Sequence, residues 1–483
     1  MAALWMFFNH YVRLASLIIL IVWELKIIDY LCGYFLQYSN LRYLLQKNAT
    51  MKLFFKLTLP LLMVLLLPSP VLAHDFAVDG IYYKRAFNNE VEVTYLGTEY
   101  WRNGDRYQGN IEIPPTVTYK NRTYTVTTIG ENAFYGCTDL TGITIPGTVN
   151  YIGYYAFEGC SSLTSITIPN SVYGIGEGAF HGTAWFDNQP EGLVYAGLVA
   201  YKYKGTMPEN TNLTLREGTL SITCDAFSYC DGLVSVTIPN SVIEINSLAF
   251  YKCHGLKSVS IGKSVRYIHH QAFLYCDSLE SISVASDNQC YDSRDNCNAI
   301  IDRFYEMLVI GCKNTVIPGT VYFIGPVAFE GSGVTSVTIP NTIDGIGDYA
   351  FNDCYALNEV YSYVSDLSEF WMGYNVFSHW DQDVYAERTL YVPRGSLEAY
   401  QADRLWSQYF GKIVEFDPIP ALLGDVNLDG LVTISDVTAL IDLLLEQSTS
   451  VTDNSQADVN GDGEITISDV TTLIDYLLNG TWN

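Results

Sequence analysis

The chain has 483 residues and a formal net charge of −26, from 52 acidic and 26 basic residues. Nucleic acids and anionic membranes repel a surface of that sign, so the composition argues against both as partners. The length exceeds one ordinary hydrophobic core, and we therefore expect a repeat array with additional pieces at its ends.

Two apolar runs lie near the amino terminus. Residues 51–73 carry a short basic head, an apolar centre from Leu57 to Leu67, and small or medium residues up to Ala73. This layout is typical of a secretory signal peptide cleaved near Ala73. Residues 1–50 hold a second run that charges interrupt, and this run is either a membrane helix or upstream sequence from a misassigned start. We favour the misassigned start, because Met51 begins a complete export signal, and expect a secreted or cell-surface protein without a stable membrane span in its mature form.

Residues 74–128 are predicted to form a β-rich amino-terminal cap. Short apolar and aromatic alternations occur at 81–83, 91–95 and 124–126, and alternation of period two is typical of strands. The end of a repeat array needs a polar outer cover, which such a cap would provide.

The central part of the chain repeats itself. An isoleucine, followed four residues later by an Ala-Phe pair, occurs eight times, at Ile129, Ile152, Ile175, Ile222, Ile245, Ile268, Ile324 and Ile346. Five of the seven steps are 22 or 23 residues, a period within the leucine-rich range. We therefore predict a repeat solenoid of about eight turns over 129–360, with insertions at 185–218 and 288–316 that account for the two longer steps.

One repeat shows why the array must stack. In Leu163 to Ile168, alternation places Ile166 and Ile168 on one face of a short strand, and Pro169 should end that strand. The opposite face carries only Gly, Ser or Thr in the repeats, so it offers few aromatic or arginine anchors to a partner. Recognition is expected instead from the two insertions and from variable positions such as Tyr154, Tyr155 and the pair His269-His270. For the histidine pair, a solvated position is the simpler interpretation.

The cysteines fall into two groups. Six occupy one place in the repeat, three residues after the phenylalanine: Cys137, Cys160, Cys230, Cys253, Cys276 and Cys354. A row of stacked, buried thiols explains such a column better than disulfides or a metal site. Cys290 and Cys297 break the period and are the better candidates for a disulfide in an exported protein.

Residues 361–416 lose the period and are rich in aromatic residues, including Trp371, Trp380 and Trp406. We predict a carboxy-terminal cap there, followed by a linker at 417–423 that contains Pro418 and Pro420.

The repeat pattern, Ile-Gly-x-x-Ala-Phe-x-x-Cys-x-x-Leu with Ile-Pro-x-x-Val, resembles the BspA-type leucine-rich repeats of bacterial surface proteins. The resemblance covers about residues 74–416. It implies a secreted or surface protein whose repeats bind a host or bacterial surface protein or a glycan, because that family is associated with adhesion to host extracellular matrix and to other cells.

Residues 424–480 contain two acidic loops, 33 residues apart, in a segment without Lys or Arg. Oxygen-bearing residues at loop positions 1, 3, 5, 9 and 12 and a backbone carbonyl at position 7 are what a Ca²⁺ site needs. In the two loops these positions are Asp425, Asn427, Asp429, Leu431, Thr433 and Asp436, then Asp458, Asn460, Asp462, Glu464, Thr466 and Asp469. An amphipathic helix is expected after each loop, so we predict a small α-helical module that binds two Ca²⁺ ions.

Duplicated loops of this kind, each followed by one helix, resemble the type I dockerin module, although position 12 is Asp rather than Glu. The resemblance implies docking to the cohesin module of a scaffold protein. In that family, loop positions 10 and 11 help to choose the partner, and here they are Ile434 and Ser435, then Ile467 and Ser468. Identical pairs in both halves imply two nearly equivalent docking orientations.

We expect from these features a non-catalytic binding or adhesion protein, anchored to a scaffold by a calcium-dependent dockerin. The alternative is a component of a cellulosome-like complex in polysaccharide catabolism, either an enzyme or a carbohydrate-binding accessory that uses Trp371, Trp380 and Tyr374. No nucleophile motif or metal-type histidine spacing indicates a catalytic module. Paired carboxylates for glycoside hydrolysis have no fixed spacing in a sequence, so spacing alone does not exclude a glycoside hydrolase.

Overall fold

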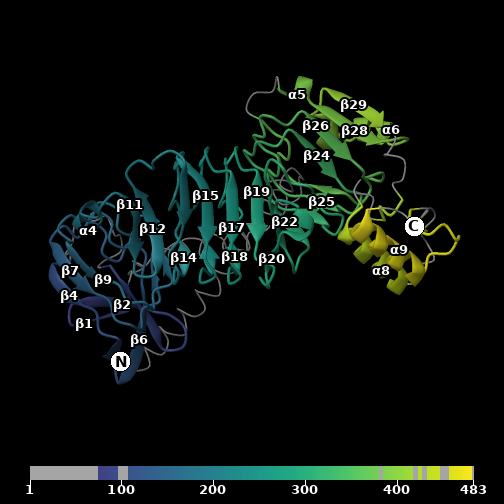
Figure 1. Cartoon of the computed structure of the whole chain (residues 1–483). Helices are drawn as coiled ribbons and strands as arrows, with labels where there is room; N and C mark the ends of the chain where they lie inside the picture. Colours follow the sequence, from purple (N-terminus) through teal and green to yellow (C-terminus); the bar gives the residue numbers. More distant parts are fainter. Residues whose placement is uncertain are drawn as a thin grey trace, which may run out of the picture. The chain divides into compact units, whose positions relative to one another are not determined.

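The computed structural model describes residues 74–95, 107–379, 384–416, 423–426, 432–446 and 456–480. The expected signal peptide, the segment 1–50 and Trp380 lie outside these ranges. Over the described ranges, no helix has both the length and the apolar character needed to cross a membrane. Figure 1 shows a long series of short strands and, at the carboxy-terminal end of the chain, the helices α8 and α9.

The first sheet begins with the amino-terminal strands. They are β1 (Phe76–Val78), β2 (Ile81–Arg85), β3 (Glu90–Thr94), β5 (Thr116–Tyr119) and β6 (Arg122–Ile129). β1, β2 and β3 pair antiparallel, whereas β3 and β6 pair parallel. Because strand side chains alternate between faces, Tyr83, Val91 and Val93 are all buried on one side. This apolar face covers the first repeat.

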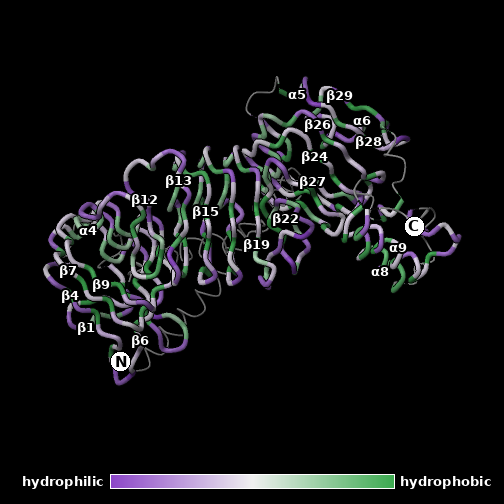
Figure 2. The backbone as a smooth tube through the Cα atoms, viewed as in Figure 1, coloured by the Kyte–Doolittle hydropathy of each residue, from purple (hydrophilic) through white to green (hydrophobic). Residues whose placement is uncertain are grey.

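Each turn of the solenoid contributes one longer strand. These strands are β4 (Gly109–Glu112), β7 (Leu140–Thr144), β9 (Ser165–Thr167), β13 (Thr211–Thr214), β15 (Leu233–Ile238), β17 (Ser258–Ile261), β19 (Ser281–Val284), β24 (Ser336–Ile339) and β26 (Glu359–Ser362). They fall into three sheets, β4-β7-β9, β13-β15-β17-β19 and one that begins with β24 and β26. Within each sheet neighbouring strands pair in parallel, for example with Val236 opposite Val259. Hydrophobic and hydrophilic residues alternate at short intervals along these turns (Figure 2). The predicted solenoid is therefore confirmed.

A second, two-residue strand holds the repeated isoleucine or its replacement. These strands are β8 (Tyr151–Ile152), β10 (Gly174–Ile175), β14 (Ser221–Ile222), β16 (Glu244–Ile245), β18 (Tyr267–Ile268), β23 (Phe323–Ile324), β25 (Gly345–Ile346) and β27 (Trp371–Met372). The turns approach closely here, which explains the glycine that follows the isoleucine in several repeats. A Cβ on Gly176 would lie 2.4 Å from the backbone nitrogen of Tyr154.

The phenylalanines of the Ala-Phe pairs form stacks through the core. Ring centroids are 5.0 Å apart between Phe134 and Phe157, and 5.1 Å apart between Phe227 and Phe250. The rings in both pairs are nearly parallel, and all four side chains are fully buried. Each ring thus finds its apolar partners in the adjacent turns, as a single repeat could not provide them.

The solenoid has more turns than the eight that the repeated isoleucine predicts, and one of them follows Phe351. Phe377 stacks on Phe351 with a centroid distance of 5.0 Å. In this turn Val376 stands where the other repeats have alanine, and Met372 stands where they have isoleucine. This turn keeps the apolar pattern with other residue types, so a pattern of Ile followed by Ala-Phe does not identify it.

The cysteine column consists of buried thiols, as predicted. Several of them donate a hydrogen bond to the phenylalanine carbonyl of the preceding turn. The distances are 3.0 Å from Cys253 Sγ to the Phe227 oxygen and 3.1 Å from Cys276 Sγ to the Phe250 oxygen. The predicted disulfide between Cys290 and Cys297 is wrong, since both are free; the Cys297 thiol is buried in the core.

Both insertions contain consecutive antiparallel strands, and the last strand of each pairs with the next repeat. The first comprises α4 (Ala184–Asp187), β11 (Gly192–Ala196) and β12 (Val199–Lys204); the second comprises β20 (Tyr291–Asp292), η1 (Arg294–Asn296), β21 (Ile300–Asp302) and β22 (Met307–Ile310). β12 pairs in parallel with β14, and β22 with β23. The sheet of short strands is interrupted at each insertion, and the buried apolar side chains fall into separate clusters there.

Residues after β26 continue the stack although the sequence period ends. They form α5 (Val384–Glu387), β28 (Thr389–Pro393), α6 (Leu397–Ala402), α7 (Arg404–Ser407) and β29 (Lys412–Phe416). β28 and β29 extend the sheet of β24 and β26 in parallel. Trp406 is buried in this region, whereas Trp371 is half-exposed.

A buried arginine closes the last turns. Arg388 has no exposed surface, and its guanidinium donates hydrogen bonds to the carbonyl oxygens of Leu357 (3.1 Å), Phe377 (2.6 Å) and Cys354 (2.9 Å). Burial lowers the pKa of Arg388. The side chain supplies the donor to the carbonyl oxygens of Leu357 and Phe377 and a second donor to that of Cys354, which also accepts from the Leu357 nitrogen.

Candidate calcium-binding and docking site

The carboxy-terminal module is built around two helices, α8 (Ile434–Glu446) and α9 (Ile467–Asn479), which pack on each other. Their apolar faces share a small core of buried residues: Val437, Leu440, Ala457, Val459, Val470 and Leu473. A backbone hydrogen bond of 3.0 Å from the Gly424 nitrogen to the Gln456 oxygen joins the beginnings of the two acidic segments. The predicted two-helix organisation is confirmed.

The second acidic loop is folded so that its side-chain oxygens turn inward. The Asp458 carboxylate accepts hydrogen bonds from the backbone nitrogens of Asp462 (3.0 Å) and Gly463 (2.9 Å). The Asn460 side chain also accepts from the Asp462 nitrogen, at 2.8 Å, and Asp462 accepts from the Glu464 nitrogen at 2.8 Å. Gly463, at loop position 6, has a φ of +84°, which only glycine adopts readily.

Position 12 of this loop, Asp469, ties its two ends together. The carboxylate is fully buried and accepts hydrogen bonds from the backbone nitrogens of Asn460 (3.1 Å) and Thr466 (2.8 Å). Thr466 is also the N-cap of α9, and its hydroxyl accepts from the Ser468 nitrogen at 3.2 Å. The predicted residues at positions 1, 3, 5, 9 and 12 therefore lie in one folded loop.

The described part of the first loop has the same ending. Asp436 is fully buried and accepts a hydrogen bond of 2.8 Å from the Thr433 nitrogen, as Asp469 does from Thr466. Asp425 at position 1 is buried as well. Asn427, Asp429 and Leu431 lie outside the described residues.

The donor set fits a hard, oxygen-binding cation. Carboxylate, amide and hydroxyl oxygens with a peptide carbonyl are the ligands that Ca²⁺ takes. Among the described residues, no three His, Cys, Asp or Glu side chains gather as a metal cluster. The second loop instead combines Asp and Glu residues with the neutral oxygen ligands Asn460 and Thr466. Buried carboxylates such as Asp436 and Asp469 are costly without compensation; backbone N–H groups supply part of it, and a bound divalent cation would supply more.

The four residues predicted to choose the docking partner sit at the start of the two helices. Ile434 is 59% exposed and Ile467 is 69% exposed. Ser468 is also exposed, and its hydroxyl is hydrogen-bonded to the Asn460 amide at 3.1 Å. Ser435 is buried. The two exposed isoleucine side chains are accessible for contact with a partner.

Some of the solenoid residues at which recognition was expected lie at a cavity. Tyr155 lines a cavity together with residues of the first insertion, where recognition was expected. Glu177, which lines the same cavity, was missed; the interruption of the repeat period was the one signal that pointed to it. The rings of His269 and His270 stack on each other at 4.3 Å, and burial lowers the pKa of each.

Comparison with known families divides the chain in the same way. Residues 111–188, 199–298 and 299–379, more than half of the chain, match the BspA type leucine rich repeat region. Residues 423–478 match the dockerin type I domain. A dockerin domain implies calcium binding and a cohesin partner in general. Both matched families are non-catalytic, and no catalytic family was found.

Several solved structures resemble the chain. A leucine rich cell surface protein from Faecalibacterium prausnitzii is 23% identical, with a TM-score of 0.37, covering 70% of this chain and 94% of its own. A leucine-rich repeat protein from Bacteroides ovatus is 24% identical, with a TM-score of 0.34, covering 71% and 77%. The pneumococcal vaccine antigen PcpA is 14% identical, with a TM-score of 0.30, covering 72% and 99%. No curated protein matches significantly.

Proposed function

Because the chain belongs to the BspA-type leucine-rich repeat family and carries a type I dockerin domain, we propose that it is an exported, non-catalytic binding protein. Its repeats hold a surface protein or glycan, and its dockerin anchors it to a scaffold that bears cohesin modules. The sequence of residues 51–73 supports export with cleavage near Ala73.

The observation that carries this proposal is the folded second loop. Asp458, Asn460 and Asp462 turn their oxygens into the loop, and Asp469 joins its ends. The first loop repeats this ending at Thr433 and Asp436. We therefore infer two ions, one for each loop, held by the twelve positions named above. When bound, Ca²⁺ neutralises the clustered carboxylates and makes the order of the loops depend on the cation.

The docking surface that follows from the loops is the pair of helix starts. Ile434 and Ile467 provide exposed apolar contacts, and Ser468 provides an adjacent hydroxyl. The loop before each helix fixes the first turn, so calcium controls the positions of these side chains. Repetition of the Ile-Ser pair in the sequence supports docking in two orientations, with Ile434 and Ile467 as the equivalent exposed contacts.

A calcium-dependent capture experiment tests the proposal. The full-length mature chain is used to capture proteins from the native secretome, with calcium or with chelator, and bound proteins are identified by mass spectrometry. We expect a cohesin-bearing protein that is captured only with calcium. Capture that persists in chelator, or the absence of any cohesin-bearing protein, contradicts the proposal.

Paired substitutions provide the matched control. Replacing Asp425 and Asp458 together by Ala should abolish capture, because it removes position 1 from both loops. Replacing Asp442 and Asp475 by Ala removes two exposed charges from the same helices outside the loops and should leave capture intact. Equal capture by both pairs would contradict the assignment.

A second candidate, a carbohydrate-binding accessory, is supported by aromatic residues on the surface. Trp371 is 51% exposed and Tyr374 is 73% exposed, so the cap does not bury them. Trp371 stacks with Phe323 at 5.6 Å across the strand that contains Gly345. Depletion from solution by insoluble plant and host glycans, lost in Trp371→Ala, would favour this function. Turnover of any glycan would favour the enzyme alternative instead.

A further inference from the structure

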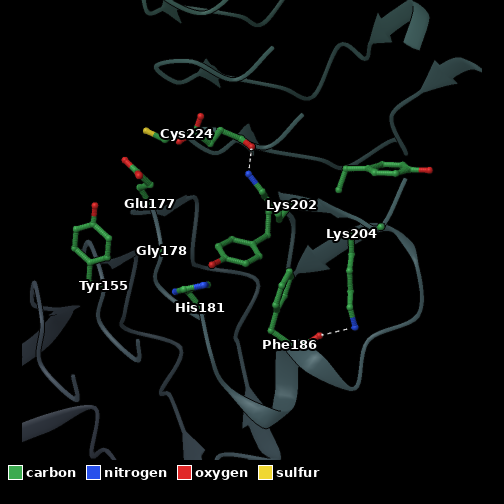
Figure 3. Close-up of a pocket in the computed structure, with 12 residues that line it drawn as sticks. Tyr155, Glu177, Gly178, His181, Phe186, Lys202, Lys204 and Cys224 are labelled. Carbon is green, nitrogen blue, oxygen red and sulfur yellow. Dashed lines mark hydrogen bonds between the residues drawn. The ribbon is translucent and has the colours of Figure 1, made fainter. Parts of the chain in front are cut away.

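A cavity lies where the first insertion interrupts the stack. The sheet that contains β8 and β10 ends at β10, and the next sheet begins with β11, β12 and β14. The gap leaves a cavity of about 400 Å³ (Figure 3), with walls that include Tyr155, Glu177, Phe186, Tyr201, Lys202 and Cys224. A regular solenoid fills such space with the next turn, so the cavity is a consequence of the insertion.

Aromatic rings form two of its walls. The Tyr155 ring occupies space that a side chain on residue 178 would fill, because a Cβ on Gly178 would be 2.5 Å from its Cδ1 atom. Gly178 also has a φ of +65°, which disfavours other residues there. Phe186 and Tyr201 contact each other edge to face at a centroid distance of 5.7 Å. Glycine on one side and an aromatic pair on the other thus define the cavity.

The two lysines at the cavity are engaged by the main chain. Lys202 Nζ donates a hydrogen bond of 2.5 Å to the Asp225 carbonyl oxygen. Lys204 Nζ donates to main-chain carbonyl oxygens within 186–189, at distances of 2.5 to 3.3 Å, and the bond to Phe186 is drawn in Figure 3. Lys204 thus uses its donors within the insertion, and Lys202 binds the next repeat through the Asp225 carbonyl oxygen. An anionic ligand would have to compete with these bonds.

The Glu177 carboxylate makes its side of the cavity negative. Figure 3 shows it between Tyr155 and Cys224. The negative charge of Glu177 is the main reason that the pKa of Tyr155 is raised. Burial, followed by Glu177 and Asp225, raises the pKa of the Cys224 thiol. Tyr155 and Cys224, from different turns of the solenoid, thus both lie near the Glu177 carboxylate, whose charge favours a cation.

We propose that this cavity binds the cationic side chain of a lysine or arginine in a partner polypeptide, with Glu177 as its counter-ion and Tyr155 as an aromatic wall. The proposal rests on the binding function of the repeats and specifies the partner's chemistry. Guanidinium and ammonium groups only donate hydrogen bonds, which the carboxylate oxygens of Glu177 can accept. Aromatic faces also attract cations.

The size and opening of the cavity favour a side chain on a polypeptide. About 400 Å³ lies near the lower end of the range for small-ligand sites, so it suits one long side chain better than an oligosaccharide. The rim is open to solvent, since the His181 side chain is 74% exposed and Gly205 is exposed. A bound side chain can therefore leave the cavity toward its own main chain.

Calorimetric titration of the full-length mature chain with a capped Gly-Gly-Arg-Gly-Gly peptide tests the proposal. The control ligand has citrulline, an uncharged isostere, in place of arginine. We expect the arginine peptide to bind about tenfold more tightly than the citrulline peptide, a difference of about 1.4 kcal/mol. Equal affinities, or no binding of the arginine peptide, would overturn the proposal. Agmatine that binds as tightly as the peptide would overturn the polypeptide source, and N-acetylglucosamine that displaces it would indicate a glycan site.

Two variants locate the binding. Glu177→Gln should weaken the arginine peptide about tenfold, whereas Glu131→Gln, at the same repeat position two repeats earlier and outside the cavity, should not change it. Tyr155→Leu should weaken it about threefold through the lost ring. That substitution suits the fold, because Leu248 occupies the equivalent position with a φ of +56°. Unchanged affinity in Glu177→Gln contradicts the site.

The outcome is separable from that of the docking proposal. Peptide binding at the cavity should persist when calcium is chelated, because no residue of the acidic loops lines it. Loss of peptide binding in chelator would overturn this assignment. Failure of the peptide experiment with intact calcium-dependent capture would reject the cavity alone.

Discussion

The solenoid and the dockerin module are both built from repeats, but they bury different kinds of side chain. In the solenoid, Phe227 and Phe250 are fully buried and stack on each other. In the module, the apolar core is small, and fully buried positions include the carboxylates of Asp436 and Asp469. Apolar burial needs only the neighbouring turn, whereas buried carboxylates need a compensating charge.

This difference teaches that one chain can contain two independent sources of order. The stability of the solenoid should depend on contacts between adjacent turns and be insensitive to calcium. The module should depend on the cation, as small domains that bind a metal commonly do. Four substitutions or conditions can break or sharpen this comparison.

The largest effect is expected from the core of the solenoid. Phe250→Ala removes a fully buried ring between Phe227 and Phe273 and should cost about 3–5 kcal/mol. Tyr267→Ala removes an exposed ring and should stay within about 0.5 kcal/mol. Chemical denaturation measures both. Equal losses would contradict the stacked core.

The next effect concerns the closing turns. Arg388→Met removes the donor to the buried carbonyl oxygens of Leu357 and Phe377, whereas the Cys354 oxygen still accepts from the Leu357 nitrogen at 3.3 Å. The substitution should cost about 3 kcal/mol, since each unsatisfied group costs roughly 1–3 kcal/mol. Arg404→Met, on the surface of α7, should change the free energy of unfolding by less than about 0.5 kcal/mol. A neutral outcome for Arg388→Met would show that the carbonyls find other donors.

Alkaline pH should destabilise the solenoid through its thiols. Burial raises the pKa of both Cys230 and Cys354 to about 12, above their value in the unfolded chain. Their contribution is therefore complete below about pH 9 and is lost as pH rises toward 12, by about 1.4 kcal/mol per thiol for each pH unit. Denaturation at pH 8 and pH 10.5 measures the loss, which should be smaller in Cys354→Ala. A flat profile contradicts the buried thiols.

The smallest effect is expected at the cap of α9. Thr466→Ala removes the hydroxyl that accepts from the Ser468 nitrogen and should cost the module about 1 kcal/mol. The substitution should also lower the affinity of the loop for calcium, because Thr466 is position 9 of the loop. Thr471→Ala, on the exposed side of the same helix, is the control. Helical circular dichroism during a calcium titration measures both changes.

Much of this architecture could be predicted because its signals are local. The 23-residue spacing of Ile152, Ile175 and their equivalents identified the turns, and the Asp-x-Asn-x-Asp-Gly order identified the loops. What was missed depends on contacts between distant residues. Arg388 meets carbonyls of residues 354–377, and the cavity joins Glu177 to a hairpin some twenty-five residues later. The disulfide prediction failed because spacing carries no information on where a thiol packs.

Calorimetry of the mature chain with calcium and with chelator tests the independence of the two regions most directly. Two unfolding transitions are expected, and chelation should abolish the one that belongs to α8 and α9 while leaving the transition of the solenoid at the same temperature. A solenoid transition that falls on chelation, or a helical module that melts identically without calcium, would contradict the account.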